Sequence, residues 1–523
     1  MQTEKHSVKN NLNRFRSFRY VLILEGIVTG VVGGGVVILF RYLLTYADKL
    51  LQMVLSHGQN HIGVVACWFI VLVAGAMIVA RLLKWEGFIS GSGIPQVEGE
   101  MIGALDPCWW RVLVAKMTGG LLSIGCGLSL GREGPSIQLG AMAAKGFSRI
   151  TKRAKTEEKL LITCGASAGL SAAFNAPLAG VLFSLEEIHK HFSPEVLLST
   201  MAASITADFL SSNVFGLKPV FGFHITQMMP LSTYGHAILL GVILGGLGVV
   251  YNTCLAKTQD LFQKIPNQFG RLLIPFLLAG VLGFSYPYVL GGGHSLVETL
   301  TSEQLMVGAL CLLLILKFSF SMLSFGSGAP GGIFLPLLVL GAVMGSLYYS
   351  IMGQWTDSLN GLLDNFIILG MAGYFAAIVR APITGIILIS EMTGSFSHLL
   401  TLSLVSLIAY VIPDMVHCPP VYDQLLHRLL LKLNPEQKNV YSGEKVLVEG
   451  MIFHGCEAEG KMVSQIPWPA KCLLVSLIRG QAEFVPRGET IFAAGDKIVV
   501  LCDEADQKEL HEVLRDVCGT VKR

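Results

Sequence analysis

Long apolar runs constrain this chain more than any other feature of its sequence. Each of the longest runs carries at most one charged residue and meets or nearly meets the roughly 20 residues that cross a bilayer core: Val21–Phe40, Ile62–Ala80, Leu160–Leu185, Ala237–Ala256 and Phe318–Gly353. Shorter runs raise the expected number of segments to about ten or more. Because 52 % of the 523 residues are hydrophobic and only 14 % are charged, we expect an all-α polytopic membrane protein.

Charge near the N-terminus predicts the orientation. The first twenty residues hold one acid, Glu4, against five lysines and arginines, so residues 1–19 are expected to form a cytoplasmic segment. A full-length span follows directly, which does not fit a cleavable signal. The net charge of +2 says little about partners, and no nucleic-acid partner is expected. The eleven cysteines form no Cys-x-x-Cys pair, so neither a disulfide framework nor a metal site is expected, and no cofactor motif is found.

Residues 131–135 read Gly-Arg-Glu-Gly-Pro between two apolar runs. A charge at membrane depth is costly and is therefore typical of a functional site. Pro135 favours the first turn of a helix, and a helix start inside a bilayer presents unpaired N–H groups to an anion. Glu133 is itself an anion and can occupy the same place, so protonating it would couple proton and anion binding. The sequence alone also allows a structural Arg132–Glu133 pair at the membrane interface.

Further glycine- and proline-rich helix starts are predicted at Ser92–Pro95 and Gly328–Pro336. If they converge with the start at Glu133, they form an anion site in the middle of the membrane. Ser92 and Tyr422 hydroxyls would donate to that anion, although Ser92 is equally a common N-cap residue. Many other glycines are explained by close helix packing. The Gly-Ser-Gly-x-Pro sequence at Gly91 recurs at Gly326, which is weak support for a duplication.

Other charged groups in or beside apolar runs allow two interpretations each. Glu186 and Glu187 follow an uncharged run; they form either a solvated helix end at the membrane surface or a proton relay to Glu133. Lys116 lies inside its span and either raises the potential for anions or extends its ammonium to the interface.

The composition changes after Leu433. Short β-rich stretches at Lys445–Ile452, Cys472–Leu477 and Lys497–Cys502 alternate with turns, and Ala505–Val517 has the pattern of an amphipathic helix. We therefore expect a small cytoplasmic α+β domain over residues 440–523, after a transport domain over residues 20–433.

These motifs resemble those of the CLC family of chloride channels and proton-coupled chloride antiporters. The matching sequences are Gly-Ser-Gly-Ile-Pro at Ser92, Gly-Arg-Glu-Gly-Pro at Glu133, Gly-Ala-Pro-Gly-Gly-Ile-Phe-x-Pro at Ile333 and Phe334, Asn-Ala-Pro-Leu-Ala-Gly from Asn175 to Gly180, and the late Tyr422. The resemblance covers roughly residues 20–430. It implies a homodimer with one anion pathway per subunit, a fold of two inverted halves with broken helices, and a voltage-gated chloride channel family member of prokaryotic type.

Residues from about 440 to 518 resemble the C-terminal domain of TrkA/RCK potassium-uptake regulators. This resemblance implies either a regulatory module for a small molecule or a support for dimer assembly.

The resemblance also implies roles for single residues. Ser92 and Tyr422 would coordinate chloride with backbone N–H groups near Glu133, Gly134, Ile333 and Phe334. Glu133 would be the external gating and proton glutamate, and Glu187 the internal proton glutamate. Gln96 stands where relatives often have Glu, a departure that affects none of these residues.

The predicted function is therefore secondary active exchange of chloride for protons across the plasma membrane, the inner membrane of a bacterium, with both termini cytoplasmic. A passive gated chloride channel on the same scaffold is the alternative, and only Glu187 separates the two. An enzyme is not expected, because no nucleophile elbow or phosphate loop is found.

Overall fold

The computed structural model describes residues 2–190, 192–217, 219–223, 227–433, 445–469, 472–480, 482–503 and 506–518. The chain divides into two compact units, Met1–Arg428 and Leu429–Arg523, and each is described by itself. The predicted start of the tail domain at residue 440 and the predicted helix start at Ala505 lie outside the described residues.

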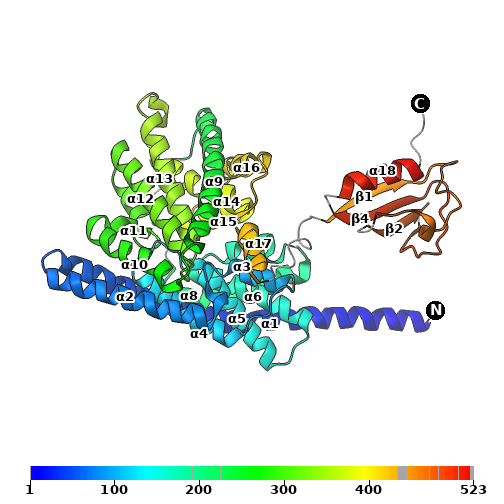
Figure 1. Ribbon diagram of the computed structural model, residues 1–523, viewed down its shortest axis with the longest axis horizontal. Coiled ribbons are helices and arrows are strands. Elements are labelled where there is room, and N and C mark those ends of the chain that lie inside the picture. The colour runs from blue at the N-terminus through cyan, green and yellow to red at the C-terminus, as the bar shows by residue number, and fades with distance from the viewer. Residues whose placement is uncertain are drawn as a thin grey trace. The chain divides into compact units, whose positions relative to one another are not determined.

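The first unit is helical (Figure 1). Its first half contains α1 (Gln2–Gly58), α2 (Ile62–Trp85), α3 (Ile94–Met101), α4 (Trp109–Gly125), α5 (Glu133–Ile150), α6 (Lys155–Phe174), α7 (Pro177–Phe183), the π-helix η2 (Ser184–His189) and α8 (Pro194–Phe215). Its second half contains α9 (Tyr234–Gln263), α10 (Gln268–Ser285), α11 (His294–Ser302), α12 (Val307–Gly326), α13 (Phe334–Met352), α14 (Leu363–Val379), α15 (Pro382–Thr393) and α16 (Leu399–Met415). Helix α17 (Val421–Leu433) follows.

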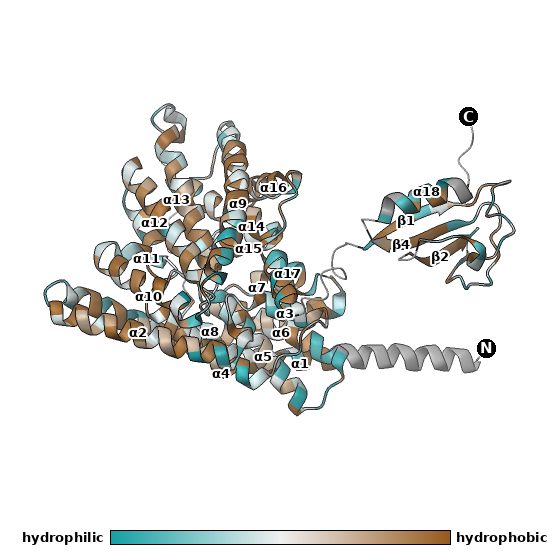
Figure 2. Cartoon of the chain, viewed as in Figure 1, coloured by the Kyte–Doolittle hydropathy of each residue, from teal (hydrophilic) through white to brown (hydrophobic). Residues whose placement is uncertain are grey.

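Six helices in the described part of the chain are long and apolar enough to cross a membrane. Their outer faces carry exposed aliphatic side chains, such as Ile70 and Ile78 on α2 and Val281 on α10, and the hydropathy colouring of Figure 2 shows apolar residues along these helices. An apolar outer surface of this extent is suited to lipid and not to water.

The two halves repeat the same order of helices, so that α2 to α8 correspond to α10 to α16. The Gly-Ser-Gly-x-Pro echo does not mark this repeat. The copy at Gly91 leads into α3, whereas Gly326 is the last residue of α12. The structural counterpart of Gly91–Gly93 is Gly291–Gly293, which leads into α11.

Glycines allow neighbouring helices to approach each other closely in both halves. A methyl group on Gly140 of α5 would lie 2.2 Å from the Gly165 carbonyl oxygen of α6. The same approach joins Gly341 of α13 to the Gly370 oxygen of α14, at 2.4 Å. The interpretation of these glycines as packing residues is therefore confirmed.

The second unit is a small α+β domain. Its sheet has the order β1-β4-β2-β3 with antiparallel neighbours: β1 (Lys445–Met451), β2 (Leu473–Arg479), β3 (Ala482–Phe484) and β4 (Lys497–Asp503). Helix α18 (Gln507–Cys518) contributes Leu510 and Leu514 to a core with Val448, Ile498 and Val500. The predicted strands at β1, β2 and β4 and the terminal helix are confirmed, whereas the three-residue strand β3 was missed.

Candidate functional site

Three helix starts meet inside the first unit. Gly131, before α5, and Gly332, before α13, form an antiparallel bridge in which each N–H donates to the other's carbonyl, at 2.6 and 2.7 Å. The Gly331 N–H donates to the Gly91 carbonyl at 3.0 Å and adds the segment before α3. These backbone hydrogen bonds hold the N-terminal ends of α3, α5 and α13 together.

Glycine is required where these starts touch. A methyl group on Gly134 would fall 2.5 Å from Ser92 Oγ. One on Gly131 would fall 2.2 Å from Glu133 Oε2 and 3.1 Å from the Leu335 nitrogen. Ser92 of the α3 start and the carboxylate of Glu133 therefore lie beside unpaired backbone N–H groups at the α5 and α13 starts.

Glu133 is the first residue of α5 and is fully buried. Neither of its carboxylate oxygens makes a hydrogen bond of normal geometry among the described residues, although the N–H groups of Glu133 and Leu335 lie close to the carboxylate. Arg132 Nε lies 4.0 Å from Oε1, at the limit of an ion pair. The Arg132–Glu133 pair is thus present only at this limit, and its carboxylate lies inside the protein. A buried carboxylate without a full set of hydrogen bonds is costly and points to an exchangeable ligand or proton.

Tyr422 reaches the same place from the first turn of α17. Its ring is fully buried and lies 6.3 Å from the Phe183 ring, which lies 5.9 Å from the Phe334 ring of α13. The Tyr422 hydroxyl lies close to the Ser92 hydroxyl and within electrostatic range of Glu133, and it makes no hydrogen bond of normal geometry among the described residues. Ser92 Oγ accepts the Ile94 N–H at 3.4 Å, but the N-cap residue of α3 is Gly93, so the interpretation of Ser92 as an ordinary N-cap is wrong.

Glu186 and Glu187 have different surroundings, and the solvated helix end is wrong for both. Glu186 accepts the Thr384 N–H at 2.9 Å and the Thr384 hydroxyl at 2.8 Å, and so caps the start of α15. Glu187 is buried, and its Oε1 has no hydrogen-bond partner among the described residues. Glu391 makes the reciprocal contact by accepting the N–H groups of Leu178 and Ala179 at the start of α7, at 3.0 and 2.8 Å.

The ammonium group of Lys116 does not extend to the membrane interface, and it is not a free cation at the helix starts. Its buried ammonium donates to the Ile89 and Gly91 carbonyls at 3.0 and 2.7 Å. Lys317 does the same in the second half, donating to the Val289 and Gly291 carbonyls at 2.9 and 2.8 Å. Sequence analysis missed Lys317 and Glu391, although each repeats the spacing of its partner in the other half.

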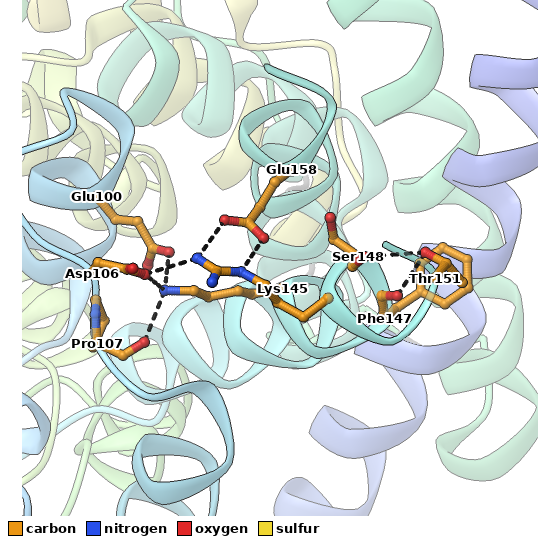
Figure 3. Close-up of polar contacts among 9 residues, drawn as sticks. Glu100, Asp106, Pro107, Lys145, Phe147, Ser148, Thr151 and Glu158 are labelled. Atoms are coloured by element: carbon orange, nitrogen blue, oxygen red, sulfur yellow. Dashed lines mark hydrogen bonds and ion pairs between the residues drawn. The ribbon is translucent and has the colours of Figure 1, made fainter. Parts of the chain in front are cut away.

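The opposite end of α5 is anchored by charged groups (Figure 3). Lys145 forms ion pairs with Glu100 and Asp106 and donates to the Pro107 carbonyl at 2.8 Å. In the loop after α3, the hydrogen bond from Lys145 holds the pKa of Asp106 below its ordinary value. These contacts fix α5 along its axis, so that its start stays at the junction with α3 and α13.

No group of three or more His, Cys, Asp or Glu side chains suited to a metal occurs among the described residues. The unpartnered groups of the junction are instead backbone N–H groups, hydroxyls and one carboxylate. Such a set binds a small anion when the carboxylate is displaced or protonated.

Comparison with known proteins identifies the class. The family model for the voltage gated chloride channel matches residues 73–414, and the TrkA-C domain model matches residues 451–515. The chain belongs to the voltage gated chloride channel family, the CLC family, and carries a C-terminal TrkA-C domain.

Individual relatives are similar over most of their length. The chain is 36 % identical to the H(+)/Cl(-) exchange transporter ClcA of Vibrio cholerae over 446 residues, covering 81 % of this chain and 92 % of the relative. It is 32 % identical to the transporter of the same name from Yersinia pestis over 452 residues, covering 84 % and 93 %. A solved structure of a slow cyanobacterial Cl-/H+ antiporter superposes with a TM-score of 0.73 at 30 % identity, covering 79 % of this chain and 98 % of that one. The predicted helical CLC fold with a small α+β domain is confirmed.

Proposed function

We propose that this protein exchanges chloride for protons across a membrane. The observation that carries the proposal is the buried Glu133 carboxylate, which makes no hydrogen bond of normal geometry among the described residues at the junction of three helix starts. The named exchange transporters among its relatives support the same activity.

In the proposed cycle, chloride lies between the Ser92 and Tyr422 hydroxyls and the N–H groups of Gly134, Ile333 and Phe334. The supporting contacts are the close approach of Gly134 to Ser92 Oγ and the bridge that precedes Ile333. Helix N-termini stabilise an anion there without a full positive charge, so binding stays weak enough for release.

Glu133 and chloride compete for this place in the proposal. The ionised carboxylate occupies the N–H groups and excludes the halide; the protonated carboxyl is neutral and leaves them. Binding of one proton to Glu133 is thereby coupled to binding of chloride, which is the condition for coupled transport. Glu187 is the proposed internal proton carrier, supported by its burial and by the unpartnered Oε1.

The wider assignment is also part of the proposal. The protein would lie in the bacterial inner membrane as a homodimer, with both termini cytoplasmic and residues 1–19 preceding the transport domain of residues 20–433. The TrkA-C domain would serve as a regulatory module that responds to a small molecule. Transport, without turnover of a soluble substrate, would be its activity.

The test is coupled flux in proteoliposomes. An outward chloride gradient should drive protons inward against their own gradient, and the reversal potential should shift with a pH gradient. A reversal potential set by chloride alone, with no proton movement, would assign the passive channel instead. Because Glu187 is buried and unpartnered, we expect the antiporter result.

A further inference from the structure

Lys190 ends the π-helix that carries Glu187. It is the C-cap residue of η2 and adopts a left-handed backbone, with φ of 53°. Left-handed backbone is uncommon for a residue with a side chain, and here it accompanies the end of the helix. The motifs that identify the family do not include this residue.

The Lys190 ammonium joins two helices of the candidate chloride site. It forms ion pairs with Glu98 of α3, the helix that starts beside Ser92, and with Asp423 of α17, the residue after Tyr422. Glu98 is 3 % exposed and Asp423 is 42 % exposed. A single cation therefore ties both hydroxyl-bearing helix starts to the end of η2.

Glu187 faces the same group of charges without a direct cation of its own. It lies within electrostatic range of Lys190, Glu98, Asp423 and Glu186. Its Oε1 has no hydrogen-bond partner among the described residues. Glu186 is occupied by the start of α15, and Lys190 pairs directly with Glu98 and Asp423. Of these carboxyls, Glu187 is the one with no direct hydrogen bond or ion pair among the described residues.

From this arrangement we infer that Lys190 is a positioning residue. Its ion pairs hold α3 and α17 in place beside Glu187, and Glu187 is thereby the carboxyl that takes up and releases the exchangeable proton. The inference rests on the proposed function. With the ammonium present, Glu98 and Asp423 are held in ion pairs, and the proton enters and leaves through Glu187. Without it, three carboxyls share the proton, and its transfer toward Glu133 is slowed.

The experiment compares proton and chloride fluxes of the full chain in proteoliposomes with chloride and pH electrodes. Lys190→Gln should lower the proton-to-chloride flux ratio by about tenfold, because a unit charge a few ångströms away strongly changes a buried site's electrostatic free energy. Lys190→Arg keeps the charge and should retain most of the wild-type ratio.

Arg428→Gln is the matched control. Arg428 pairs α17 with Asp260 of α9 at 2.6 Å, away from the Glu187 cluster. Its loss should lower thermal stability but leave the flux ratio unchanged. An equal fall in ratio for Lys190→Gln and Arg428→Gln, or no fall for Lys190→Gln, would overturn the inference.

Asp423→Asn is the second variant, for the case that Lys190→Gln does not fold. Because Asp423 is half-exposed, we expect this change to leave the fold intact. The change removes one of the two ion pairs of Lys190 and loosens α17 from η2, so the flux ratio should again fall while Arg428→Gln keeps it. An unchanged ratio in Asp423→Asn would contradict the inference.

A wild-type protein that moves no protons would overturn the proposed function together with the inference. Coupled wild-type flux with an unaffected Lys190→Gln would remove the inference alone.

Discussion

The two halves of the membrane unit share their scaffold residues. Lys116 and Lys317 each donate to carbonyls of the segment that leads into the preceding short helix, α3 or α11. Glu186 and Glu391 each cap the short helix of the other half. Such residues recur because both halves must satisfy the same buried backbone groups away from water.

The halves differ at the residues proposed to carry transport. At equivalent positions, Glu133 starts α5 and Phe334 starts α13. Glu187, next to the cap Glu186, corresponds to the buried Met392, next to the cap Glu391. The comparison teaches that residues repeated in both halves hold the scaffold together, whereas residues that differ between the halves belong to the proposed transport site.

The largest effect is expected from a change at Glu133, where the two halves differ. Glu133→Gln should reduce proton flux by about 100-fold or more, the usual contribution of a positioned proton-transfer group, while chloride flux persists. The matched change Phe334→Leu should cost about 1.5 kcal/mol or less of stability and keep proton coupling. Both fluxes are measured in proteoliposomes. Coupling that survives in Glu133→Gln and is lost in Phe334→Leu would reverse the assignment.

A smaller effect is expected at the shared lysines. Lys116→Met and Lys317→Met should each destabilise the protein by about 1–3 kcal/mol for every buried carbonyl left without a donor. The exposed Lys84 is the control, and Lys84→Met should change little. Unfolding in detergent, followed by heat or denaturant, provides the comparison. A large loss for one buried lysine and none for the other would contradict their equivalent roles.

The reciprocal caps should behave alike on a smaller scale. Glu186→Ala and Glu391→Ala each remove acceptors from a helix start and should cost about 0.5–2 kcal/mol. Neither change should alter the flux ratio by more than the exposed control Glu303→Ala does. A specific loss of proton coupling in Glu186→Ala would show that the first cap also belongs to the transport site.

The smallest effect concerns the tail domain, which lies outside the repeat. Burial alone would raise the pKa of Asp496, but its hydrogen bonds from Arg479, at 2.7 and 2.6 Å, and from the Ala493 N–H lower that pKa below its ordinary value. The pair therefore stabilises the folded tail above the unfolded-state pKa, and this contribution is lost as pH falls through about 5 toward the lower folded-state pKa.

Arg479→Met should remove this pH-dependent part of the stability. The effect should be about 1 kcal/mol, at the lower end because Arg479 is 45 % exposed and is screened by solvent. Unfolding of the tail at several pH values, followed by its tryptophan Trp468, measures it. The same acid sensitivity in Arg479→Met as in the wild type would contradict the assignment.

Hydropathy predicted the membrane class but not where helices break. The run Leu160–Leu185 is uncharged throughout, yet α6 ends at Phe174 and α7 begins at Pro177. The run Phe318–Gly353 is likewise divided between α12 and α13. Apolar composition is indifferent to such breaks, whereas the glycine and proline motifs predicted the starts at α3, α5 and α13 because they fix local backbone geometry.

The sequence motifs predicted the unpartnered groups of the site, but they did not predict the ion pairs that hold the surrounding helices together. Lys190, Glu98 and Asp423 lie far apart in the chain and share no local pattern. Their pairing depends on how η2, α3 and α17 pack together, which no short motif encodes. The capping residue Glu391 was detectable, because Pro382 and Glu391 repeat the spacing of Pro177 and Glu186.

The central claim is that a carboxylate and a halide compete for one set of backbone N–H groups. Crystals of the wild type and of Glu133→Gln grown at neutral pH in bromide would test it through anomalous scattering. The account predicts that Glu133→Gln gains a bromide beside the N–H groups of residues 133 and 335, where the wild-type carboxylate lies. Identical bromide positions in the two crystals, with residue 133 remote from every bound ion, would contradict it.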